Sequence, residues 1–133
     1  MRTLNLLSGV GIAIVGAWLA VTNLAEAQTE FTCAVPWDGP DDSCISELKI
    51  PARGVVSIEV YTIQKDGKDQ DRPATFQLLD TENKDAEVHL FTLGARSTGL
   101  WVYESNVKML VAKVRVNHPN MSKTIIRGRY SVK

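Results

Sequence analysis

The chain has 133 residues, a formal net charge of zero, two cysteines and two histidines. Beyond a leader this length allows about one domain, which argues against a multidomain organisation. The two cysteines supply half of the four ligands that a structural zinc ion needs, so a zinc module is disfavoured.

Residues 1–27 have the pattern of a secretory signal peptide. A positive start precedes an apolar run from Leu4 to Leu24, and Ala25-Glu26-Ala27 places small residues where a signal peptidase reads. We expect cleavage before Gln28. The alternative is a retained membrane anchor, since about 20 apolar residues can cross a bilayer. Either reading predicts that residues 28–133, a single domain, are secreted, periplasmic or at the cell surface.

Cys33 and Cys44 enclose the segment CAVPWDGPDDSC. A redox pair would more often have the spacing Cys-x-x-Cys, whereas an exported domain of this size gains from a structural cross-link. We therefore predict a Cys33–Cys44 disulfide. Closing a loop of about 15 residues contributes about 3 kcal/mol through loss of unfolded-state entropy, and this shorter loop contributes slightly less.

The contents of this loop suggest two further roles. Trp37, held beside proline and acidic residues in a closed loop, is a candidate binding tip, because rigidity lowers the ordering cost of binding. Asp38, Asp41 and Asp42 form a weak calcium candidate, since calcium takes oxygen ligands from acidic loops. The loop does not match the Asp-x-Asp-x-Asp-Gly calcium motif. We expect a solvated turn, no metal and no cofactor.

Short segments of alternating apolar and polar residues predict seven or eight β-strands. The expected strands are 28–35, 45–50, 55–63, 74–80, 87–93, 100–104, 109–118 and 124–132. Turn residues such as Asp66-Gly67 separate them. This pattern predicts an all-β fold, a single antiparallel β-sandwich of the jelly-roll or immunoglobulin-like type. In strand 87–93 we expect His89 and Phe91 on the exposed face, opposite Val88 and Leu90.

The segments IPARGVVSIEV, residues 50–60, and GRYSV, residues 128–132, are similar to those of small bacterial exported sandwich domains of the prepeptidase carboxy-terminal type. Both segments are short and generic, and together they cover under a fifth of the chain. The resemblance implies an exported β-sandwich. It implies no functional residue.

The two histidines are weak candidates for catalysis. A catalytic triad needs a histidine held between a nucleophile and a carboxylate, and no serine lies in a Gly-x-Ser-x-Gly elbow. His89 is expected on an exposed strand face, and His118 at a strand end beside Pro119. We therefore expect a non-catalytic protein, with a small hydrolase as the least favoured hypothesis.

Charge is unevenly distributed along the chain. Residues 28–103 carry seven Lys or Arg against thirteen Asp or Glu, whereas residues 104–133 carry seven against Glu104 alone. If the last two strands form a hairpin, four cations would share one outer face. They are Lys113, Arg115, Arg127 and Arg129. The repulsion between these four positive charges would need to be offset by Glu59 or another acid on a neighbouring strand, or by an anionic partner.

The leading hypothesis is an exported β-sandwich that acts as a binding or structural module. Its predicted partners are a protein or an anionic surface polymer, either polysaccharide or lipid head group, and nucleic acid is disfavoured. Self-assembly into a homo-oligomer or filament is a variant, with residues 28–35 added to a neighbouring sheet edge. The alternative is a secreted enzyme inhibitor that uses the disulfide loop. In a eukaryotic secretory pathway, Asn120 in Asn-Met-Ser would be a glycosylation acceptor.

Overall fold

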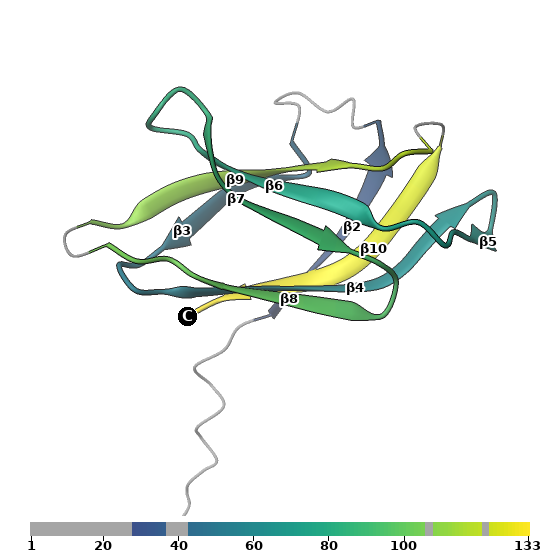
Figure 1. The fold of residues 1–133 in the computed structure, drawn as a ribbon, viewed down its shortest axis with the longest axis horizontal. Coiled ribbons are helices and arrows are strands. Elements are labelled where there is room, and N and C mark those ends of the chain that lie inside the picture. Colours follow the sequence, from purple (N-terminus) through teal and green to yellow (C-terminus); the bar gives the residue numbers. More distant parts are fainter. Residues whose placement is uncertain (1–27, 37–42, 106–107, 121–122) are drawn as a thin grey trace, which may run out of the picture.

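The computed structural model describes residues 28–36, 43–105, 108–120 and 123–133. Two antiparallel sheets pack face to face (Figure 1). In the first sheet the order is β2 (Gln28–Val35), β10 (Thr124–Val132) and β4 (Val55–Lys65), with β5 (Lys68–Asp69) and β8 (Ser97–Val102) both pairing with β4. In the second sheet the order is β3 (Ile45–Ile50), β9 (Leu110–Asn117), β6 (Ala74–Asp80) and β7 (Ala86–Leu93). The predicted all-β sandwich is confirmed.

The strand order identifies the type of sandwich. The first strand lies beside the last, and β2-β10-β4-β8 faces β3-β9-β6-β7. Apart from the small β5, this arrangement of eight strands is that of a jelly roll rather than of an immunoglobulin domain. Among the described residues, no helix is both long and apolar enough to span a membrane.

Alternation within each strand builds the core. Strands β4, β6 and β9 turn their apolar residues inward, as the sequence predicts, and all of these side chains are buried. They are Val56, Ile58, Val60, Ala74, Phe76, Leu78, Leu110, Ala112, Val114 and Val116. Phe31 of β2 meets Phe76 of the opposite sheet edge-on, with ring centroids 6.0 Å apart. The core therefore lies between the sheets, and the polar strand faces lie outside.

The expected orientation of β7 is wrong. His89 pairs with Leu78 and Glu87 pairs with Leu79, so Val88 is an extra residue that forms a β-bulge. Phe91, opposite the inward Phe76, is buried, and Leu90 is exposed. Both alternating sets in this strand contain apolar residues, so periodicity could not decide the face. Pairing with β6 decides it.

The expected hairpin between the last two strands is also wrong. β9 pairs with β3 and β6, whereas β10 pairs with β2 and β4. In a jelly roll these consecutive strands belong to opposite sheets, so their polar faces point away from each other. The predicted four-cation face does not exist in the structure.

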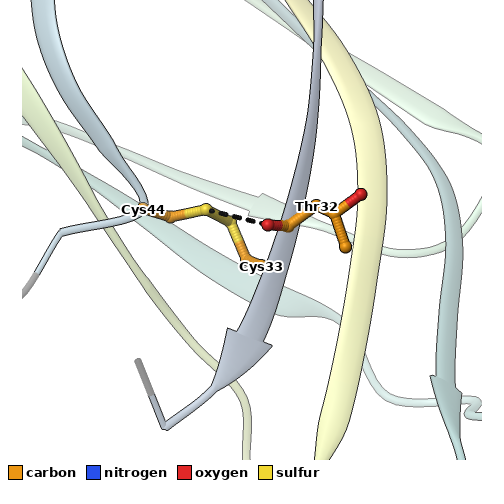
Figure 2. Close-up of a disulfide and its surroundings, with 3 residues drawn as sticks. All are labelled: Thr32, Cys33 and Cys44. Atoms are coloured by element: carbon orange, nitrogen blue, oxygen red, sulfur yellow. Dashed lines mark hydrogen bonds between the residues drawn. A yellow bond between two sulfur atoms is a disulfide. The ribbon is translucent and has the colours of Figure 1, made fainter. Parts of the chain in front are cut away.

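The Cys33–Cys44 disulfide is confirmed (Figure 2). Cys33 is fully buried on β2, and Cys44 directly precedes β3, where its N–H donates to Val114 O at 3.1 Å. The two Cα atoms are 5.7 Å apart. The bond therefore ties the first strand of one sheet to the first strand of the other. Cys44 Sγ also lies 3.6 Å from the carbonyl oxygen of Thr32.

We expect the Cys33→Ala, Cys44→Ala double variant to lose about 2–3 kcal/mol of unfolding free energy, because the unfolded chain regains the entropy of an open loop. Urea denaturation of both proteins measures the difference. Reduction of the unaltered protein should give a similar loss and leave the double variant unchanged. Equal stability of the two proteins would contradict a stabilising role for the cross-link.

Candidate functional site

The four cations predicted to share one face lie on two opposite faces of the sandwich. On the second sheet, Lys113 forms an ion pair with Asp85, with Nζ and Oδ2 3.0 Å apart, and Arg115 lies opposite Gln77 of β6. On the first sheet, Arg127 and Arg129 lie two residues apart on β10. A shared anion site for all four is therefore ruled out by the topology. Their individual binding roles stay predictions.

Arg129 is part of a charged row that crosses three strands. Its Nε donates to Glu59 Oε1 at 2.7 Å, and Glu30 lies opposite it on β2. The hydrogen bond to Glu59 is the main cause that raises the pKa of Arg129 above its usual value. The guanidinium also lies 6.0 Å from the ring centroid of Tyr61. Glu59, considered above as compensation for the predicted four-cation face, thus pairs with Arg129.

Arg127 has a different environment on the same strand. Its cross-strand neighbours are Thr32 and Thr62, and among the described residues it forms no ion pair. Its exposed side chain borders a shallow hollow of about 150 Å³. The hollow is also lined by Glu30, Phe31, Thr32, Tyr61 and Gly128. Arg127 is thus an exposed cation of β10 that is available to contact an external anion.

A β-bulge shapes this part of the sheet. Arg127 pairs with Thr62 and Gly128 with Val60, so Tyr61 is the extra residue of β4. Gly128 is required there, because a side chain would overlap the carbonyl oxygen of Glu59. The bulge separates the cross-strand neighbours of Arg129 from those of Arg127, and Tyr61 lies beside both arginines. Sequence periodicity could not show this offset, since it arises from the pairing of β4 with β10.

His89 lies in an aromatic cluster where β7 and β8 close one side of the sandwich. Its ring is stacked on Trp101 at 4.9 Å with an interplanar angle of 8°, and it meets Phe91 edge-on at 4.7 Å. Trp101 in turn contacts Tyr103. Partial burial lowers the pKa of His89 below its usual 6.5, and the Glu87 carboxylate partly opposes this effect. His89 therefore packs inside the edge of the sandwich and is not the fully exposed residue predicted.

His118, expected at a strand end, directly follows β9 and is buried, with 3% of its area exposed. Nδ1 accepts the main-chain N–H of Asn120 at 3.0 Å, so the neutral ring donates from Nε2 to Arg72 O at 2.9 Å. Both ring nitrogens are used by the main chain. In this arrangement neither can serve as the base of a triad. The sequence held a signal for its burial, because His118 continues the inward alternation of β9.

The binding tip and the calcium site stay predictions, because their residues lie outside the described residues. They are Trp37, Asp38, Asp41 and Asp42. Within the described ranges, no group of three His, Cys, Asp or Glu side chains is placed to hold a metal. Asn120 Oδ1 accepts from Lys65 Nζ at 3.2 Å and Nδ2 donates to Gln70 Oε1 at 3.3 Å, so a glycan on Nδ2 would compete with the contact to Gln70.

The lowered pKa of His89 predicts a pH effect on stability. The unfolded chain takes up a proton at about pH 6.5, whereas the folded protein does so only at lower pH, so stability falls as pH drops below about 6.5. Denaturation at pH 7.5 and pH 5 should show a smaller loss for His89→Gln than for the unaltered protein. An NMR titration midpoint of the His89 ring above 6.5 would contradict this assignment.

Replacement of His118 is expected to destabilise the fold through unsatisfied main-chain groups. His118→Ala leaves the Arg72 carbonyl and the Asn120 N–H without their partner, at about 1–3 kcal/mol for each buried group. Urea denaturation measures the loss. Removal of a solvated surface histidine would cost less than about 0.5 kcal/mol, and that result would contradict the structural role.

No family model matches the chain, and neither does any curated protein. Among solved structures, the chain is similar to one from Bacillus endospore appendages, described as a novel family of disulfide-linked pili. The two share 8% sequence identity and a TM-score of 0.41, over 80% of this chain and 81% of that chain. Values this low define neither a family nor a function for this protein.

Proposed function

We propose that this protein is a non-catalytic module, exported to the periplasm, the cell surface or the extracellular matrix, that binds or structures other molecules there. The observation that carries the proposal is the buried disulfide that joins the two sheets. Such bonds form and persist in oxidising compartments outside the cytoplasm. The signal-peptide pattern of residues 1–27 points to the same compartments.

The described side chains favour binding over catalysis. His118 uses both ring nitrogens for main-chain contacts, and His89 is stacked on Trp101 and meets Phe91 edge-on. The charged residues of the strands are on the outer strand faces. A sheet face of this kind suits an extended partner, such as a surface polymer or another protein, better than it suits an enclosed small substrate.

Arg127 is the favoured contact for an anionic partner. It borders a hollow that also offers the Tyr61 ring and the Thr32 hydroxyl, and a guanidinium donates well to sulfate, phosphate or carboxylate groups. Arg129 is less suited to this role because Glu59 and Glu30 already neutralise it. The chemistry shared by the predicted partners is thus an anionic group on a surface polysaccharide or lipid head group.

Charge-reversal variants distinguish the role proposed for Arg127 from that proposed for Arg129. We expect Arg127→Glu to weaken binding to dextran sulfate by about tenfold, the order expected for one lost charge-assisted contact. Arg129→Glu should instead reduce stability, because it places a carboxylate between Glu30 and Glu59. The matched control is Lys49→Glu, on the other sheet. Binding that is insensitive to salt and unchanged in Arg127→Glu would contradict this contact.

The broader proposal is tested in the native setting. The immobilised full chain is exposed to the envelope or culture fluid of the source cells, and bound molecules are identified by mass spectrometry. We expect specific capture of an extracytoplasmic protein or polymer, with the chain recovered outside the cytoplasm and its disulfide oxidised. A reduced, cytoplasmic chain would overturn the proposal.

A further inference from the structure

β8 is a sheet edge without the devices that commonly protect edges. Bulges, charges or a covering element usually prevent an edge strand from pairing with another chain. At β2, Cys44 Sγ lies 3.6 Å from the Thr32 carbonyl oxygen, and Glu30 is an exposed charge on the strand. β3 has a register shift and the exposed charges of Glu47 and Lys49, and β7 has its bulge at Val88. β8 pairs with β4 in one continuous register, contains no charge or proline, and pairs with no second strand among the described residues.

The free edge of β8 can be assigned from its pairing with β4. Tyr103 N–H donates to Gly54 O at 2.8 Å, so the main-chain groups of Tyr103 face β4. Because these groups alternate along a strand, those of Trp101 and Gly99 also face β4. The main-chain groups of Thr98, Leu100 and Val102 therefore point to the open edge.

The same three residues turn their side chains outward. Trp101 and Tyr103 pack against the core, whereas Leu100 is 68% exposed and Val102 is 48% exposed. Immediately outside the strand, Arg96 at one end and Glu104 at the other are exposed as well. The exposed apolar residues of β8 thus lie between a cation and an anion. Arg96 and Glu104 are equally far from Leu100 along the chain.

We propose that β8 pairs antiparallel with β8 of a second copy of this chain, about a two-fold axis at Leu100. This inference rests on the proposed function, as a structural module, and names a partner for it. Leu100 then lies opposite itself, and Thr98 lies opposite Val102 of the other copy. Arg96 of each copy faces Glu104 of the other. The pairing joins the two first sheets into one continuous sheet across the dimer.

The geometry fulfils the requirements of an antiparallel ladder. Within the strand, Thr98, Leu100 and Val102 share one face and direct their main-chain groups to the shared edge, which allows about six hydrogen bonds. Arg96 has a positive φ of 59° and Glu104 lies beyond the strand end, so these two residues meet through their side chains, outside the ladder. The two leucines and two valines form the apolar centre, with two ion pairs at the rim. Charge complementarity favours a second copy, because the sequence from Arg96 to Glu104 complements itself when reversed. A six-residue edge buries little area, so the dimer is weak, with Kd on the order of micromolar or higher.

The first test uses charge reversal and mixing. Arg96→Glu places one carboxylate opposite each Glu104, and Glu104→Arg places one guanidinium opposite each Arg96, so both contacts become repulsive and each full-length variant alone should dimerise at least about tenfold more weakly. An equimolar mixture restores both ion pairs and should recover dimer in sedimentation equilibrium. Arg72→Glu and Glu82→Arg, exposed residues in other turns, are matched controls. Variants that associate like the unaltered chain, or a mixture without recovery, would overturn the proposal.

The second test reports the register. At a hydrogen-bonded pair the Cα atoms are about 5.5 Å apart, within disulfide range. Leu100→Cys should therefore form a covalent dimer on mild oxidation. Thr98→Cys faces Val102 of the other copy and should not cross-link with itself, whereas a mixture of Thr98→Cys and Val102→Cys should. Equal cross-linking of Leu100→Cys and Thr98→Cys would contradict this register.

These measurements use only the purified chain, so their result is separate from that of the proposed function. A monomeric chain at millimolar concentration would overturn pairing through β8 while leaving capture of an extracytoplasmic partner intact. A dimer that forms through β8 in a chain recovered reduced from the cytoplasm would overturn the proposed function and leave the self-pairing surface in place.

Discussion

Burial of one face of every strand against the opposite sheet is the constraint on which the rest of the structure depends. The inward residues of β4, β6 and β9 are nearly all aliphatic or phenylalanine and are buried, so charge can lie only on the outer faces. Apolar burial contributes roughly 25 cal/mol per Å², which makes this face the dominant stabilising feature of so small a domain. The outer faces are then available for contacts with other molecules.

Different groups lie at the two open sides of the sandwich. On one side, the disulfide links β2 to the start of β3, and Cys44 Sγ lies beside the Thr32 carbonyl oxygen. On the other side, an aromatic cluster lies between β7 and β8, formed by His89, Phe91, Trp101 and Tyr103. This cluster packs at the edge of the core and leaves the outer edge of β8 without a pairing strand among the described residues. The proposed contact with a second copy uses the main-chain groups and exposed aliphatic side chains of that edge.

Electrostatics on the first sheet follows from the same topology. β10 lies between β2 and β4, so a cation on β10 meets residues from two neighbours at once. Arg129 meets glutamates on both sides, and Arg127 meets threonines. Two arginines that are equivalent in the sequence thus differ in what they can do, one stabilising the sheet and the other remaining available to an anion. On this sheet, the acidic and basic parts of the chain thus meet in the ion pair between Glu59 and Arg129.

The sequence by itself determined the disulfide, most of the strand positions and the inward faces of β4, β6 and β9, because period-two alternation and cysteine spacing are local signals. The strand expected at residues 100–104 is instead β8, Ser97–Val102, and the short β5 was not expected. It also contained a signal for the burial of His118, which continues the alternation of β9. Only the tertiary structure decided that β9 and β10 belong to opposite sheets, that the Val88 bulge turns Phe91 inward, and that Arg129 rather than Arg127 is neutralised. Each of these depends on which strands pair and in what register. Pairing joins residues far apart in the chain, and no local pattern specifies it.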